Sequence, residues 1–235
     1  NRGYGYSPIE GVADDRSFPW FLYWEIVWVV LNTPFRRGDR VLDLGGSSSL
    51  FSAFLASRGL DVTTVDLNET LVENGNHVGR EMGWKLDNRV MDMRELSFDR
   101  PFDHITSICV YEHIPMYDRI EINKKIRDLL VPGGKFSITF DYRNPSRAAR
   151  IDSPEDVFAQ FVKPSGLRVR GNERFLDDRR NYLLHPFFYK NLALRDLWLW
   201  KRESIRGGHF RWWEFPLVKW WNDYTFGALF QEKSV

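Results

Sequence analysis

The stretch of sequence that decides the fold is VLDLGGSSS, residues 41–49, in which an apolar strand runs into a turn of small residues. A helical pattern follows over residues 50–58. Such a turn lets a ligand approach the backbone, and the N-terminus of the following helix exposes N–H donors that have no partner within the helix. The stretch therefore predicts a site for a nucleotide-like ligand at the end of a buried strand.

Short apolar runs alternate with helical patterns from Arg40 to Asp141. This rhythm is typical of βαβ units, so it predicts a doubly wound α/β sheet with parallel strands. The rhythm loosens after Asp141, although residues 167–170 and 224–231 have the pattern of a sixth and a seventh strand. The first five strands are expected at residues 41–44, 62–66, 89–91, 105–110 and 135–140, and helices at residues 50–58, 69–82 and 119–130, the last stopped by a turn at residues 132–134.

A chain of 235 residues suits one domain with insertions. Ser17 and Pro19 predict the start of a helix that runs to about Asn32, and the sequence SPED at residues 153–156 predicts a second capped helix start. The expected organisation is an N-terminal arm and helix (1–39), a ligand-binding core (40–174), an insertion rich in Trp and Arg (175–222), and a last strand and tail (223–235).

Composition excludes several classes of protein. A formal net charge of +1 gives no overall field that would attract a polyanion, so nucleic acid is not expected as a partner. The single cysteine, Cys109, excludes an internal disulfide and a multi-cysteine zinc site, and suits a cytoplasmic location. Residues 18–31 are apolar but are interrupted by Pro19 and Glu25 and are shorter than the roughly 20 residues of a membrane span, so they predict a buried or docking helix. They also lack the features of a signal peptide.

The type of nucleotide-like ligand depends on two acidic residues and on the spacing of the glycines. Asp66 ends the second strand 21 positions after Gly45, where a carboxylate accepts both hydroxyls of a ribose. That spacing also fits NAD, but the dinucleotide pattern G-x-G-x-x-G fails because Gly45 and Gly46 are adjacent. Asp43 beside the turn is unfavourable for a pyrophosphate and suits an ammonium group. S-adenosylmethionine (SAM) has an ammonium group and no phosphate.

With these features, residues 40–142 resemble the class I SAM-dependent methyltransferases, in particular the small-molecule branch with a variable C-terminal half. The resemblance implies a Rossmann-like sheet of seven strands, mostly parallel with the last strand antiparallel. Glycines that the family places at positions 47 and 49 are serines here, so Gly45 carries more of the assignment. The resemblance implies that the cofactor is held by Asp43, Gly45, Gly46, Ser47, Asp66, Leu67, Asp92, Met93 and Val110, with Asp66 at the ribose and Asp92 at the adenine amino group.

The loop after the fourth strand carries the candidate catalytic residues, Glu112 and His113, because in the resembled fold this loop lies beside the methyl-bearing sulfur. A neutral His removes a proton from an acceptor near pH 7, so His113 is the candidate base. The alternative is that Glu112 holds cofactor or backbone groups and that His113 packs structurally. Tyr111 and Tyr117 are expected to line the same opening. No metal site is predicted, since Asp103, Asp141 and the five His form no compact ligand pattern.

The identity of the acceptor rests on weaker patterns. Tryptophans at 212–213 and 220–221 predict a packed core, a stacking wall for an acceptor or an edge that contacts a membrane peripherally. Arginines in the same region suit an acidic or glycan-like acceptor. We therefore expect a SAM-dependent methyltransferase acting on a small molecule such as a sugar or glycan precursor. The alternatives are a NAD-dependent oxidoreductase and a non-catalytic binding module of the same fold, and the oligomeric state stays open.

Overall fold

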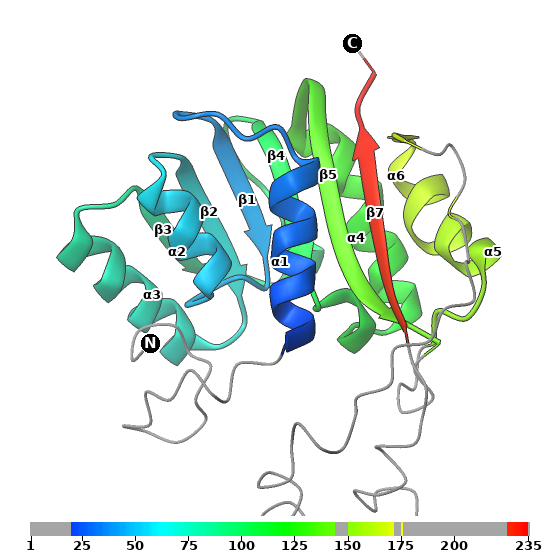
Figure 1. Ribbon diagram of the computed structural model, residues 1–235, viewed down its shortest axis with the longest axis horizontal. Coiled ribbons are helices and arrows are strands. Elements are labelled where there is room, and N and C mark those ends of the chain that lie inside the picture. Colours follow the sequence, from blue (N-terminus) through cyan, green and yellow to red (C-terminus); the bar gives the residue numbers. More distant parts are fainter. Residues whose placement is uncertain (1–19, 144–149, 172–174, 176–224, 235) are drawn as a thin grey trace, which may run out of the picture.

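The computed structural model describes residues 20–143, 150–171, 175 and 225–234. Within these ranges the chain forms one seven-stranded sheet with the strand order β3-β2-β1-β4-β5-β7-β6 (Figure 1). Strands β1 to β5 pair in parallel, whereas β7 runs antiparallel to both β5 and β6. This arrangement confirms the predicted Rossmann-like α/β class. The strands are β1 (Arg40–Leu44), β2 (Asp61–Asp66), β3 (Leu86–Val90), β4 (Phe102–Ile108), β5 (Leu130–Tyr142), β6 (Arg168–Val169) and β7 (Thr225–Glu232).

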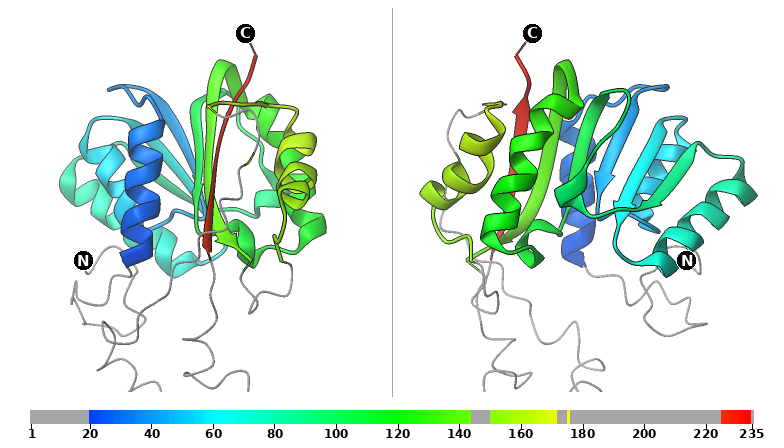
Figure 2. Two further views of the ribbon diagram at one scale, coloured as in Figure 1. Left: turned by 45° about the vertical axis from the view of Figure 1, so that its right-hand side comes forward. Right: turned by 180° about the vertical axis from the view of Figure 1, so that it is seen from behind.

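Helices cover the sheet on both faces (Figures 1 and 2). One buried cluster packs α1 and α2 on one face, and a larger cluster packs α4 and the segment around α5 and α6 on the other. The helices are α1 (Trp20–Asn32), α2 (Leu50–Ser57), α3 (Glu69–Met82), α4 (Met116–Leu129), α5 (Pro154–Val157) and α6 (Lys163–Ser165), with a π-turn, η4 (Phe158–Val162), and two 3₁₀ turns, η2 (Met93–Glu95) and η3 (Tyr111–His113).

Side-chain caps set most helix starts. Ser49 caps α2 by accepting a hydrogen bond from the Ser52 backbone N–H at 3.0 Å, and Asn68 caps α3 in the same way. Ser153 and Asp156 form the predicted capping box at the start of α5. The start of the first helix at Ser17 lies outside the described residues.

Several boundaries differ from the sequence predictions: β4 begins at Phe102 rather than at residue 105, and α4 begins at Met116 rather than at residue 119. The expected turn at residues 132–134 is instead part of β5, which takes over at Leu130 as soon as α4 ends at Leu129. β3 begins at Leu86, whereas the sequence predicted a start at residue 89. The prediction missed the first residues because most side chains of this strand are exposed and no apolar run marks it. Gly133 accommodates the early part of β5 with a positive φ of 75°.

Candidate active site

The turn between β1 and α2 depends on two adjacent glycines. Gly45 has φ +74°, and a Cβ atom there would lie 2.7 Å from a methyl carbon of Val110. At Gly46 a Cβ atom would overlap the Asp43 carboxylate, since it would lie 1.8 Å from Oδ2. Any larger residue at either position would displace the loop after β4 or the acid beneath the turn. The turn therefore brings its backbone against the loop after β4 and against the Asp43 carboxylate.

The serines at 47 and 49 do not prevent the turn from closing. Ser47 is buried and its hydroxyl lies 2.7 Å from Oγ1 of Thr64. Ser49 caps α2, and its φ of −85° needs no glycine. Among the three serines 47–49, the one with a left-handed backbone is Ser48, with φ 59°. Glycine at 47 and 49, which the family pattern calls for, is thus not required for the shape of this loop.

Asp43 lies under the turn, where its two carboxylate oxygens are engaged by hydroxyl groups. Ser52 donates to Oδ2 at 2.5 Å and Thr106 donates to Oδ1 at 2.8 Å. Burial raises the pKa of Asp43 to about 6, and the two hydroxyl donors partly oppose that rise. The carboxylate borders a small space of about 30 Å³ together with Gly45 and Gly46. Contact between Asp43 and the ammonium group of a ligand stays a prediction.

A larger cavity of about 450 Å³ opens at the carboxyl ends of β1 to β4. This is the edge at which ligands bind in doubly wound α/β sheets. It is lined by seven of the residues singled out from the sequence: Gly45, Asp66, Leu67, Asp92, Met93, Val110 and His113. The sequence did not identify the rest of the wall: Met91, Arg94, Cys109, Ile114, Pro115, Asp118 and Ile122. Carboxylates therefore lie among apolar side chains, as binding of a nucleoside requires.

Asp66 has one free carboxylate oxygen for a ligand. Its Oδ1 atom accepts a hydrogen bond from the Asn68 backbone N–H at 2.9 Å. The other oxygen makes no hydrogen bond within the part of the chain that the structure describes. It is oriented by the same short loop that caps α3. The residue is thus held in place and still able to accept ribose hydroxyls.

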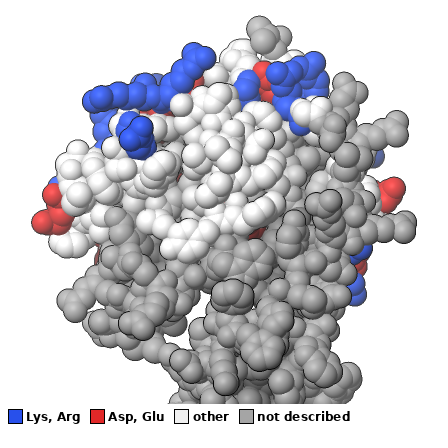
Figure 3. Space-filling view, in the orientation of Figure 1, with Lys and Arg blue, Asp and Glu red and all other residues white. Residues whose placement is uncertain are grey.

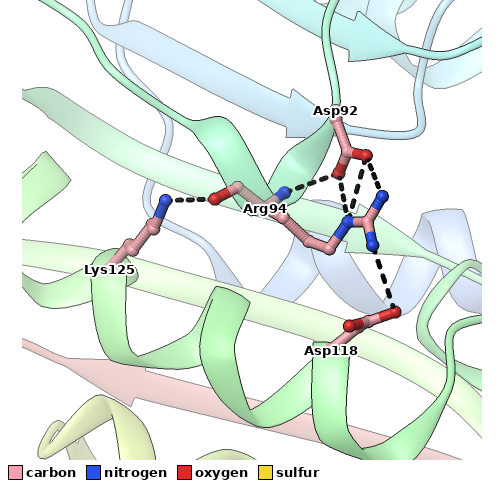
Figure 4. A network of polar contacts seen from close by, with 4 residues as sticks. All are labelled: Asp92, Arg94, Asp118 and Lys125. Atoms are coloured by element: carbon pink, nitrogen blue, oxygen red, sulfur yellow. Dashed lines mark hydrogen bonds and ion pairs between the residues drawn. The ribbon is translucent and has the colours of Figure 1, made fainter.

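Asp92 is more heavily engaged than the sequence suggested (Figure 4). The Arg94 side chain donates to both of its carboxylate oxygens, at 3.1 and 3.0 Å from Nε and at 2.6 Å from Nη2. Arg94 also approaches Asp118 on α4, at 3.8 Å. Hydrogen bonds from Arg94 hold the pKa of Asp92 below its usual range, so the carboxylate stays ionised. Asp92, Arg94 and Asp118 together form a charged border at one end of the cavity.

Glu112 and His113 are neighbours in η3 but lie in different surroundings. His113 is exposed and lines the cavity, whereas Glu112 is 4% exposed. Tyr111 was expected at the opening, but it is fully buried and packs edge-on against Phe161 at 5.4 Å. Tyr117 is 71% exposed and does not line this cavity. The expectations for both tyrosines were therefore wrong, because the turn directs Tyr111 into the core.

A group of buried carboxyls lies behind this loop, and the sequence did not reveal it. Glu25 of α1 is completely buried, and Glu112 and Asp141 are nearly so. Neither oxygen of Glu25 has a hydrogen bond of normal geometry within the described residues. Burial, reinforced by the charges of Glu112 and Asp141, raises the pKa of Glu25 to about 8, despite an opposing effect of nearby Thr139.

Cys109 joins this group and also lines the cavity. Burial, followed by the charge of Glu112, raises the pKa of its thiol, so it is a neutral thiol at physiological pH. One ligand atom from each of Cys109, Glu112 and Asp141 falls within 4.8 Å of the others, a spacing in which a cation fits. The sequence pattern did not show this grouping, since its members come from separate elements.

These features define a Rossmann-like protein with a cavity at the carboxyl ends of its strands, the edge at which such folds bind nucleotides. A methyltransferase-domain family model matches residues 41–134. The chain is 35% identical over 165 residues to the ubiquinone biosynthesis O-methyltransferase of Xanthomonas euvesicatoria pv. vesicatoria, a match that covers 64% of this chain and 68% of that protein. The chain belongs to the class I SAM-dependent methyltransferases, with SAM as its cofactor.

Solved structures agree with the fold. A sarcosine dimethylglycine methyltransferase from Galdieria sulphuraria, described as putative, superposes with a TM-score of 0.63 at 16% identity, over 92% of this chain and 86% of that one. Phosphoethanolamine N-methyltransferase 2 of Haemonchus contortus, in complex with phosphomonomethylethanolamine and S-adenosylhomocysteine, gives a TM-score of 0.60 at 20% identity, over 91% and 53%. The oxidoreductase alternative has no support in these findings.

Proposed function

We propose that this methyltransferase transfers the methyl group of SAM to a hydroxyl oxygen of a small acceptor, with His113 receiving the hydroxyl proton. The observation that carries the proposal is the position of the loop 109–113. It contributes Cys109, Val110 and His113 to the cavity wall and Glu112 to the buried carboxyl group behind that wall. A proton acceptor and a source of negative charge therefore lie next to the cofactor site.

For the cofactor, the proposed contacts divide into two sets. Direct contact comes from cavity-lining residues, with Asp66 at the ribose hydroxyls and Asp92 at the adenine edge. Asp43, Gly46 and Ser47 do not line this cavity and are proposed to hold the turn in shape from beneath. The fit is supported by Gly45, where a side chain would fill the narrow approach to Val110.

When SAM is bound, it supplies a methyl group on a positively charged sulfur that leaves as a neutral thioether. His113 accepts the proton of the hydroxyl as the oxygen forms its bond to the methyl carbon, so the imidazole becomes an imidazolium. Glu112, the neighbouring residue, and Asp141 belong to the buried group behind the loop, and in this proposal their negative charge stabilises the imidazolium. The proton therefore ends on His113 and the methyl group on the acceptor oxygen, and the reaction needs no further reactant.

The choice of oxygen as acceptor atom has separate support in the name of the Xanthomonas relative, which is an O-methyltransferase. Phenols and sugars both present hydroxyls, and a sugar or glycan precursor stays part of the proposal. We also propose that the N-terminal arm (1–39) and the insertion (175–222) enclose the acceptor within a single domain. Residues 1–19 of the arm and residues 176–222 of the insertion lie outside the described residues.

The test is a methyl-transfer assay with SAM and parallel sets of phenols, sugars and primary amines. We expect transfer to hydroxyl acceptors, and His113→Ala to lower kcat by about 10²- to 10⁴-fold. S-adenosylhomocysteine binding measured by calorimetry should change little. His77→Ala is the matched control, because His77 is an exposed residue of α3 away from the cavity.

Two results would contradict the proposal. Methylation of amines alone would exclude the hydroxyl acceptor. Full activity of His113→Ala, together with a loss of activity in Glu112→Gln, would move the role of base to the buried carboxyl group. The pH profile separates a base from a packing residue, because removal of a base abolishes the acidic limb of the kcat profile.

A further inference from the structure

The outer face of α1 is apolar from Tyr23 to Leu31. Tyr23, Val27 and Leu31 recur every four residues and are 47%, 51% and 78% exposed. The only charged residue of α1 is Glu25, which is directed inward and buried. A helix with an apolar outer face is unfavourable in water and normally has a cover. No helix among the described residues has the length and apolar character to cross a bilayer.

The apolar surface of α1 continues onto the neighbouring helix α2. Phe54 of α2 is 41% exposed, and α2 packs beside α1 through the shared buried cluster that includes Phe51 and Leu55. Figure 3 views the molecule from this side and shows a broad surface without charged residues over the two helices. We call the surface formed by Val27, Leu31 and Phe54 the apolar face.

Cations border one end of the apolar face. Arg36 and Arg37 are exposed in the loop between α1 and β1, and Arg58 is exposed at the C-terminal end of α2. Arg37 lies against Gly59, the residue next to Arg58, with its Cγ atom 3.1 Å from where a Cβ of Gly59 would be. None of the three guanidinium groups forms an ion pair within the described residues. Figure 3 shows basic side chains along the upper border of this surface.

We propose that the apolar face and these three arginines form a docking surface for an anionic lipid bilayer. The apolar side chains enter the boundary between headgroups and acyl chains, as those of an amphipathic helix lying in the membrane plane do. The arginines bind lipid phosphates, for which their planar guanidinium groups are suited. A second copy of the same face fits less well, because its border carries the same positive charges. This docking surface stands independently of the proposed acceptor.

The test is co-sedimentation of the full chain with vesicles of phosphatidylcholine, with and without phosphatidylglycerol. We expect binding to the anionic vesicles that weakens as salt is added. Arg36→Glu, Arg37→Glu and Arg58→Glu combined should lower the partition coefficient by about a hundredfold, since each basic residue near an anionic surface contributes about fivefold. Val27→Glu with Leu31→Glu should abolish binding.

Matched controls are Arg80→Glu and Met82→Glu on α3, which change exposed residues of the same types elsewhere. Circular dichroism and thermal unfolding establish that each variant is folded. Absence of binding by the native chain to anionic vesicles would overturn the proposal, as would binding unchanged by both sets of substitutions. A dimer that Leu31→Glu dissociates, without any vesicle binding, would assign the apolar face to a second copy instead.

Discussion

Two buried carboxyl groups, Asp43 and Glu25, show how differently two regions of the molecule are built. We call the turn 43–49 with Asp66 and Asp92 the cofactor half. The buried group of Glu25, Cys109, Glu112 and Asp141 behind the loop 109–113 is the acceptor half under the proposed function. Asp43 receives hydrogen bonds from two hydroxyl groups, and its pKa is about 6. Burial, reinforced by the charges of Glu112 and Asp141, raises the pKa of Glu25 to about 8, and nearby Thr139 opposes that rise only in part. The difference arises from the partners rather than from burial, which the two acids share.

The comparison shows which part of the site is satisfied before any ligand binds. In the cofactor half, both carboxylate oxygens of Asp43 are paired by neighbouring hydroxyl groups, as expected of a preorganised binding site. Behind the loop 109–113, Glu25 is a carboxyl group whose ionisation is unfavourable in the folded protein, a pattern that is frequent at catalytic sites. Four changes test this contrast, and their expected effects decrease from first to last.

Gly45→Ala should have the largest effect on the cofactor half. The added Cβ atom would lie 2.7 Å from Val110 in a left-handed backbone conformation, so we expect loss of detectable S-adenosylhomocysteine binding and about 3 kcal/mol of destabilisation. Gly83→Ala is the control, because Gly83 has a similar φ of +66° and no atom near its Cβ position. It should cost only about 1 kcal/mol and leave binding intact. Calorimetry and urea unfolding measure both effects, and equal losses in the two variants would contradict this account.

Glu25→Gln tests the acceptor half through stability. The pKa of Glu25 is raised from 4.5 to about 8, so its contribution to stability is fully present below pH 4.5 and is lost as the pH rises towards 8. Glutamine does not titrate. The variant should therefore be more stable than the native protein by about 3 kcal/mol at pH 7 and nearly equal to it at pH 4.

Urea unfolding at several pH values measures this difference for Glu25→Gln. Glu73→Gln on α3 is the control, since Glu73 is exposed. A stability difference for Glu25→Gln that is the same at pH 4 and pH 7 would show that Glu25 is not held in its protonated form.

Asp66→Asn should weaken S-adenosylhomocysteine binding by about tenfold or more, because one or two hydrogen bonds to a charged acceptor are lost. The amide oxygen can still accept the hydrogen bond from the Asn68 N–H, so stability should change little. Asp61→Asn at the opposite end of β2 is the control and should bind as the native protein does. If the two variants bind equally well, Asp66 is not the ribose ligand.

Arg94→Gln should have the smallest effect, about a threefold weaker binding of S-adenosylhomocysteine, because exposed ion pairs contribute little. The change removes the link between Asp92 and Asp118 at the border of the cavity. Arg89→Gln removes a comparable exposed pair with Asp87 that does not line the cavity, and should not affect binding. A loss of a hundredfold for Arg94→Gln would make this arginine a main cofactor contact.

Much of the cofactor half could be predicted from local sequence. Asp43, Gly45 and Gly46 lie within one turn, and Asp66, Asp92 and Val110 follow successive strands that end at the same edge of the sheet. The period of the strands and helices therefore placed most of these residues at the cavity. Sequence alone allows a serine here to cap the following helix, and Ser49 does so. The contact of Ser47 with Thr64 of the neighbouring strand and the positive φ of Ser48 were not visible.

The sequence by itself determined the class of fold, the edge of the sheet that carries the site and the family, because these follow from local periodicity and from motifs of a few residues. Only the tertiary structure brought Glu25, Glu112 and Asp141 together, from α1, η3 and β5. Their proximity depends on how α1 packs across β4 and β5, and no pattern along the chain encodes it. The same packing leaves one side of α1 uncovered, and an exposed apolar face becomes visible only when the opposite face is known to be buried.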